Sequence, residues 1–196
     1  DTKGVSSYGA WISGGGNGAG QFEAHYVVAL AKAALTMPEY EYNGESVLDR
    51  LTYMLTEMQK CQEAYAQKDP ENAGYFSAII VDNFDALEEG RTVLEDGTTR
   101  WVPWYFYHKN LEALLDVYTY APDASLREIA YDMLCKASDW VYKRMSSIDE
   151  TIRQRVLTVE YGGMAEVLYQ TYRVTKDPDH FKAAQYFEEK SFLDNV

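Results

Sequence analysis

Hydrophobic residues recur with helical spacing along most of the chain. Between residues 21 and 36, Tyr26, Leu30 and Ala33 follow the i, i+4, i+7 spacing of one helix face. The same periodicity predicts further helices over residues 45–66, 104–120, 125–145, 163–175 and 178–190. Proline residues stand at or near several of these boundaries, where they start or stop helices. The pattern therefore predicts an all-α chain.

Two pairs of these helices repeat one pattern at an offset of 54 residues. The matched positions are Leu114 with Leu168, Tyr118 with Tyr172, Asp123 with Asp177, and Ala130 with Ala184. Each block is a helix, a short turn with Asp and Pro, and a second helix. Repeated helical hairpins of this size indicate a solenoid or a closed toroid. A toroid gathers the starts of its inner helices at one mouth. No linker divides the chain, so we predict one domain over residues 1–196.

The helical rhythm breaks between residues 70 and 104. Residues 74–81 have the aromatic and β-branched character of a short strand. Asp96-Gly97 predicts a hairpin between residues 92–95 and 98–101. We therefore expect a small β-hairpin insertion near residues 74–101, and insertions of this length often carry function.

The charge of the chain restricts its partners. Eighteen basic and 31 acidic residues give a net charge of −13, which repels phosphate backbones and anionic lipid. We therefore expect neither nucleic acid nor a membrane surface as a partner. Aromatic residues make up 14% of the chain, with 17 tyrosines. Aromatic faces with polar edges suit sugar rings, although many of these side chains can equally fill gaps between helices.

The cysteines predict no metal site in this segment. Cys61 and Cys135 stand singly in helical patterns, with no second thiolate or histidine at ligand spacing. We expect both to be small buried hydrophobes and the segment to bind neither zinc nor another cofactor.

The predicted mouth of the toroid contains the candidate binding residues. Residues 21–25, 104–108 and 161–163 lie at equivalent starts of inner helices, where free N–H groups favour ligand oxygens. His108 follows the densest aromatic run and is the strongest single candidate, although a histidine there can also simply bond a backbone carbonyl. The predicted sugar-binding residues are His108, Trp104, Tyr161, His25, Gln21 and Trp101. His180, on an outer helix, is expected at the surface.

The segment 160–163 and four glutamates leave alternatives open. The paired glycines Gly162 and Gly163 permit either close approach of a ligand or merely a tight turn. A carboxylate pair for glycoside hydrolysis is possible among glutamates near inner-helix starts, but their spacing singles out no pair. These glutamates are Glu23, Glu112, Glu160 and Glu166.

Five short motifs resemble a known enzyme family when taken in order. They are GQFEAHY (20–26), CQEA (61–64), GYFS (74–77), WVPWY (101–105) continuing to His108-Lys109, and YGGMAEVL (161–168). Over nearly its whole length the chain resembles glycoside hydrolase family 127, the β-L-arabinofuranosidase family. The resemblance implies an (α/α)6 barrel and retaining hydrolysis of terminal arabinofuranose. In that family a zinc-bound cysteine is the nucleophile and a glutamate is the acid/base.

The resemblance also implies what this segment lacks. The paired cysteines, the acid/base and the other zinc ligands of the family lie beyond the matched region. We therefore expect about half of a barrel, the N-terminal half, which supplies sugar-binding residues; zinc belongs to the full-length protein. Ala165 stands where the family commonly has Asn, and Gln21 where a His is frequent, so the exact sugar stays open.

Two other functions are consistent with parts of the pattern. A helical-toroid polysaccharide lyase would use residue types present at Tyr107, His108 and Asn110, although adjacent helical residues point about 100° apart. A non-catalytic helical-repeat scaffold would explain the repeat but not the aromatic insertion.

An incomplete barrel would leave apolar inner faces uncovered. We expect partial exposure of Leu111, Leu114, Leu115, Val167 and Leu168. Such a surface predicts self-association, association with the missing half, or marginal stability.

Overall fold

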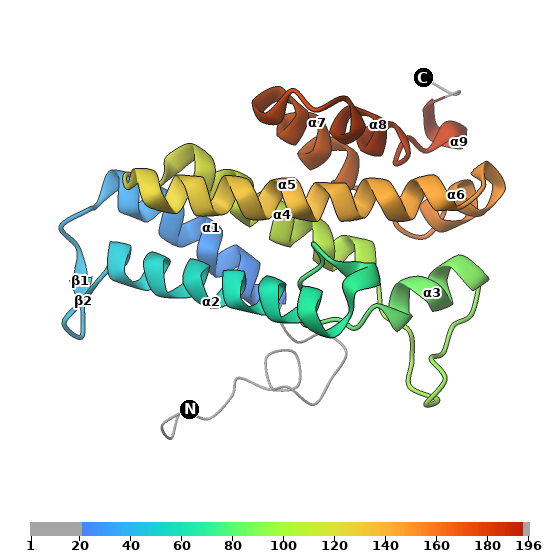
Figure 1. Ribbon diagram of the computed structural model, residues 1–196, viewed down its shortest axis with the longest axis horizontal. Coiled ribbons are helices and arrows are strands. Elements are labelled where there is room, and N and C mark those ends of the chain that lie inside the picture. The colour runs from blue at the N-terminus through green and yellow to red at the C-terminus, as the bar shows by residue number, and fades with distance from the viewer. Residues whose placement is uncertain (1–20, 194–196) are drawn as a thin grey trace.

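The computed structural model describes residues 21–193, and helices form most of that part of the chain (Figure 1). The long helices come in pairs: α1 (Gln21–Thr36) with α2 (Val47–Lys68), α4 (Pro103–Tyr120) with α5 (Ala124–Ser147), and α7 (Met164–Thr175) with α8 (Pro178–Gln185). The shorter elements are β1 (Glu41–Tyr42), β2 (Glu45–Ser46), η1 (Pro70–Asn72), α3 (Asp82–Glu89), α6 (Glu150–Leu157) and α9 (Lys190–Leu193). The all-α prediction is confirmed.

The pairs form two layers. Helix α4 contacts α1 on one side and α7 on the other, while α5 lies between α2 and α8 and crosses in front of α4 in Figure 1. Glu23 and Asn110 line one hollow, and further along the same helices Lys32 Nζ lies 2.8 Å from Asp116 Oδ2. Helices α1 and α4 therefore run parallel. Parallel inner helices joined by outer helices are the arrangement of part of an (α/α) barrel.

The sequence repeat corresponds to a structural repeat. Leu114 and Leu168 occupy equivalent buried positions on α4 and α7. The outer helices begin alike, because the carboxylates of Asp123 and Asp177 each accept a hydrogen bond from the backbone N–H two residues later. Such a cap satisfies one N–H group of the first helical turn. The 54-residue offset therefore relates the hairpin α4–α5 to the hairpin α7–α8.

Residues 74–81 do not form the predicted strand. No described strand lies beside them, and side chains bond their carbonyl groups instead: Gln62 Nε2 donates to Gly74 O at 2.8 Å, and Tyr75 donates its hydroxyl proton to Ile79 O at 2.5 Å. Tyr75, Phe76, Ile79 and Val81 of this segment are buried in the core, whereas Ile80 is exposed, and α3 follows at once. The predicted hairpin around Asp96-Gly97 is reduced to a single bridge between Val93 and Thr99.

Other elements differ from those that the hydrophobic periodicity predicts. A two-residue hairpin, β1–β2, forms around Asn43-Gly44, where both residues adopt positive φ. Helix α6 was not expected from sequence, and Asp149 caps its start by accepting from Ile152 N at 2.9 Å. The last predicted helix ends at Gln185, not at residue 190, and α9 follows separately.

Several burial predictions are wrong. The apolar residues expected to be uncovered, Leu111, Leu114, Leu115, Val167 and Leu168, are all buried, although Leu115 and Val167 border a cavity between α4 and α7. The expected apolar surface therefore no longer supports self-association, which stays a prediction. Cys61, expected in the core, is exposed on α2, while Cys135 is half-buried. Among the described helices, none combines the length and the apolar character that crossing a membrane requires.

Candidate active-site cavity

An aromatic core fixes the start of α4. We define it as Tyr75, Phe84, Trp104, Tyr107 and Trp140, whose rings contact one another. Trp104 is only 1% exposed, and its ring centroid lies 4.6 Å from that of Phe84. The prediction that Trp104 offers a ring face to a sugar is therefore wrong. The ring anchors the helix that carries His108.

His108 lies against the start of α7. Gly163 has φ of 85°, and a Cβ added there would stand 2.7 Å from both Nε2 and Cδ2 of His108. No side chain fits in that space, so the glycine permits the backbone to approach the imidazole ring. The two interpretations of the paired glycines were close approach of a ligand and a tight turn; at Gly163 the group that the backbone approaches is the His108 ring and not a ligand. Gly162 has open space around it.

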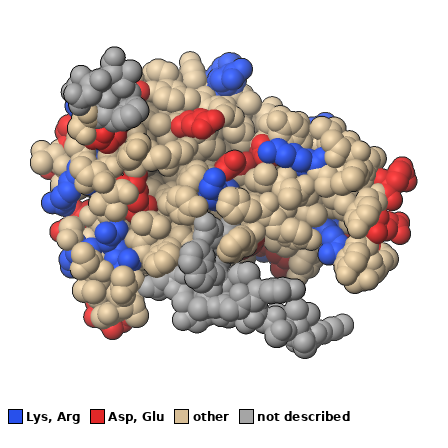
Figure 2. Space-filling view, turned by 180° about the vertical axis from the view of Figure 1, so that it is seen from behind, with Lys and Arg blue, Asp and Glu red and all other residues tan. Residues whose placement is uncertain are grey.

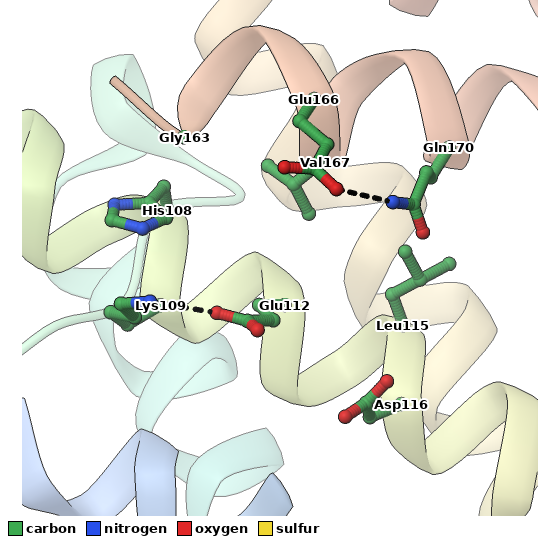
Figure 3. A pocket seen from close by; sticks show the side chains of 9 residues that line it. All are labelled: His108, Lys109, Glu112, Leu115, Asp116, Gly163, Glu166, Val167 and Gln170. Atoms are coloured by element: carbon green, nitrogen blue, oxygen red, sulfur yellow. Dashed lines mark hydrogen bonds and ion pairs between the residues drawn. The ribbon is translucent and has the colours of Figure 1, made fainter. Parts of the chain in front are cut away.

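A cavity of about 270 Å³ opens between α4 and α7 beside this contact (Figure 3). Residues from equivalent repeat positions face one another across it, since Glu112 and Asp116 on α4 correspond to Glu166 and Gln170 on α7. The lining residues are His108, Lys109, Glu112, Leu115, Asp116, Gly163, Glu166, Val167 and Gln170. The cavity is thus mostly polar, with two apolar side chains.

Each carboxylate of the cavity has a partner that orients it. Lys109 Nζ lies 3.0 Å from Glu112 Oε2, and Gln170 Nε2 donates to Glu166 Oε1 at 3.1 Å. Asp116 is paired with Lys32 of α1. The face seen in Figure 2 shows acidic and basic side chains lying together near its centre, within a larger uncharged surface. The cavity therefore offers hydrogen-bond donors and acceptors at short range.

The surroundings of the His108 ring favour its neutral form. Burial lowers the pKa of His108 below its ordinary value, and the charge of Lys109 lowers it further. The charge of Glu112 opposes this lowering of the pKa, and the carbonyl groups of Trp104 and Tyr105 oppose it less; neither carbonyl aligns as a hydrogen-bond acceptor for Nδ1. A neutral imidazole has one N–H donor and one nitrogen acceptor, which suits a hydroxyl group.

Glu160 comes just before the paired glycines and lines an adjoining hollow, not this cavity. Its carboxylate Oε2 accepts a hydrogen bond from the backbone N–H of Tyr105 at 2.9 Å. Its other oxygen, Oε1, is buried without a hydrogen bond, and Arg100 Nη1 lies 3.8 Å away, close enough for an ion pair only. Burial raises the pKa of Glu160 to about 7 against the opposing effects of the Tyr105 N–H and of Arg100.

The other predicted site residues are not brought into the cavity. Tyr161, 52% exposed, lines an adjoining hollow together with Tyr105 and Val102. Trp101 is half-buried, with its ring centroid 6.3 Å from that of Phe106. His25 is exposed on the first turns of α1, beside Phe22. The side chain of Gln21 lies outside the described residues.

The residues proposed for a lyase do not converge. Tyr107 is fully buried in the aromatic core, which raises its pKa well above the ordinary value. Asn110 is also buried and donates to Phe76 O at 3.4 Å. Only His108 of the three lines the cavity, so this alternative loses its structural basis.

The cysteines do not fit a zinc-thiolate centre. Cys61 is on α2 and Cys135 on α5, and burial raises the pKa of both thiols, which disfavours the thiolate that zinc requires. Neither belongs to a described group of three metal-ligating side chains. No step of catalysis can be derived through zinc from these residues.

His180 is buried rather than at the surface, which corrects its predicted place. It is 1% exposed, and its Nδ1 and Nε2 lie 2.9 Å from Thr175 Oγ1 and 3.0 Å from Asp139 Oδ1. With Asp177 it forms a group of potential metal ligands that sequence spacing missed, because Asp139 comes from another helix. The bond to Asp139 joins α5 to α8, and the bond to Thr175 joins the end of α7 to α8.

Comparison with protein-family models gives a match over nearly the whole chain. The model described as the catalytic domain of GH127 β-L-arabinofuranosidase matches residues 2–195. No curated protein matches the chain significantly. The family match confirms the resemblance inferred from the five motifs.

Proposed function

Since the chain belongs to the family of GH127 β-L-arabinofuranosidase catalytic domains, we propose that the cavity between α4 and α7 binds the sugar in glycoside hydrolysis. The sugar is a terminal arabinofuranosyl group or a related neutral sugar of a plant glycan. The observation that carries the proposal is the convergence of His108 with repeat-equivalent polar residues around one cavity.

The chemistry of the cavity suits a neutral polyhydroxyl ligand. Sugar hydroxyl groups both donate and accept, so a site needs carboxylates, amides and cations in alternation. Glu112, Asp116 and Glu166 accept, Lys109 donates, and Gln170 does both. Leu115 and Val167 offer small apolar areas for the C–H face of a sugar. An anionic uronate fits poorly because the chain carries a net charge of −13.

In this proposal the described residues hold the sugar and do not supply the nucleophile. Neither cysteine lies in the cavity, and both thiols have raised pKa values. Zinc in the full-length protein would activate a cysteine thiolate. The role of His108 is to hydrogen-bond a hydroxyl group of the sugar, and the glutamates of the cavity orient the sugar ring.

A titration of the chain with arabinose tests the proposal. We expect H108A to weaken arabinose binding about tenfold, because one or two hydrogen bonds at roughly 0.5–1.5 kcal/mol each are lost. Isothermal titration calorimetry or ligand-observed NMR measures the dissociation constant. H25A serves as the matched histidine variant, since His25 lies outside the cavity lining.

The result separates the competing sites and functions. Weakening by H108A with little change in H25A supports the cavity, whereas the reverse places the sugar at the start of α1. Binding of galacturonate in preference to arabinose would support a lyase. Binding of peptides but of no sugar would support the helical scaffold and overturn the proposal.

A further inference from the structure

Helix α4 begins without a capping side chain of its own. Val102 precedes the helix and makes no side-chain cap, and Pro103 at the first position has no N–H to donate. The next N–H groups, those of Trp104 and Tyr105, lie in the first turn, where the helix itself offers no carbonyl acceptor. A helix start buried in a protein needs an acceptor for such groups. Here the acceptor comes from a segment 55 residues further along the chain, the carboxylate of Glu160.

The same carboxylate connects the irregular insertion to the cavity. Arg100, the charged group that faces Glu160 among the described residues, ends the insertion before α4. Arg100 is itself fixed, because its Nε donates to Arg91 O at 2.8 Å and its Nη1 to Trp101 O at 3.1 Å. Glu160 therefore joins the insertion, the start of α4 and the loop that leads to α7.

Glu160 lies only three residues before the glycine that contacts the His108 ring beside the cavity. Gly163 follows Glu160 closely and stands against the His108 ring with no space for a side chain. His108 in turn lies one helical turn after the capped N–H of Tyr105. Glu160 thus fixes both sides of the contact between Gly163 and His108. A displacement of the carboxylate would move both together.

We propose that Glu160 is a positioning residue for the sugar site: it caps α4 from another segment, is fixed by Arg100, and so holds Gly163 against His108. This inference rests on the proposed function for its sugar but not for its geometry. Glu160 does not line the cavity between α4 and α7, so it acts through His108 and the glycine loop.

Titration gives this role a distinctive signature. The pKa of Glu160 is raised from 4.5 to about 7, chiefly by burial. In the interval between those values the folded chain keeps a proton that the unfolded chain releases, so this group makes the chain less stable as pH rises through the interval. E160Q carries a neutral amide that still accepts from Tyr105 N–H, so it should lack this dependence.

Nuclear magnetic resonance of the 196-residue chain tests the inference. We expect the Tyr105 amide resonance to titrate with a midpoint near 7, and the midpoint to vanish in E160Q. E160A should shift the His108 ring and Gly163 amide resonances and weaken arabinose binding at least fivefold, with a smaller loss in E160Q. The matched control is E88Q, because Glu88 is another carboxyl with a pKa raised by burial and an arginine partner, Arg144, at 2.6 Å. E88Q should keep the Tyr105 midpoint and the affinity.

The outcomes separate positioning from sugar binding. A Tyr105 amide that does not titrate, or an E160A chain with unchanged His108 and Gly163 resonances, overturns the inference. If E160A does not fold, the Tyr105 titration in the wild type and in E160Q still decides. If the wild type binds no arabinose, the proposed function fails, while the resonances of His108, Gly163 and Tyr105 still test the positioning role.

Discussion

Replacement of Trp104 with alanine is expected to lower the free energy of unfolding by about 3–5 kcal/mol. Trp104 is enclosed by Phe84, Trp140 and Phe187, whose ring centroids lie 4.6, 5.8 and 5.0 Å from its own. Truncation would leave a cavity that these rigid rings cannot refill. Domains of this size are stable by only about 5–15 kcal/mol, so the loss is a large share. Urea unfolding followed by circular dichroism measures it.

Two neighbouring substitutions show whether packing is the cause. W104F keeps a ring in the core and removes an indole N–H that has no hydrogen-bond partner, so we expect a loss of about 1–2 kcal/mol. Y105A removes a ring that is 39% exposed from the next position, with an expected loss smaller than that of W104A. If W104A stays as stable as the wild type but loses arabinose binding, Trp104 is a sugar platform after all.

Periodicity predicted the helices because each buries one continuous face. Leu114 and Leu168 mark that face on α4 and α7, and the shared Asp caps mark the outer helices, so the sequence repeat was sufficient to find the structural repeat. The prediction of a strand over residues 74–81 was wrong for a physical reason. Strand-like residues such as Ile79 and Val81 serve equally well as core residues, and only tertiary contacts decide between the two states.

The site was predicted in part. His108 could be found because a histidine followed an aromatic run at a helix start. Trp104 was misplaced because an aromatic run does not reveal which ring faces inward; the helix turns about 100° per residue, so Trp104 and Tyr105 face the core and the surface respectively. The role of Glu160 was not visible either, since its hydrogen bond to Tyr105 joins segments 55 residues apart.

The cavity also depends on a pairing of glutamates that their position near the starts of inner helices did not identify. Glu112 and Glu166 were candidates together with Glu23 and Glu160, and the structure places only the first pair in the cavity lining. They share an equivalent position in the 54-residue repeat. Repeat-equivalent polar residues on neighbouring inner helices are therefore the sequence feature that could have selected them.

The largest effect on sugar binding is expected from Gly163→Ala. The added methyl would stand 2.7 Å from Nε2 and Cδ2 of His108, and alanine at a φ of 85° is strained by about 1–2 kcal/mol. Either the imidazole turns away or the start of α7 moves outward, and both changes deform the cavity. We expect arabinose affinity to fall at least tenfold, measured by calorimetry, with a shift of the His108 ring resonances.

Two glycine controls separate the clash from the strain. Gly97 has a φ of 82° and open space around it, so G97A also places alanine at a positive φ but without a contact; G162A has neither a positive φ nor a contact. We expect G97A to lose about 1–2 kcal/mol of stability while it keeps its affinity for arabinose. If G163A binds arabinose as tightly as G97A does, the His108 ring does not contact the sugar. The sugar would then have to bind elsewhere, because a site built around that ring depends on the space that only glycine leaves.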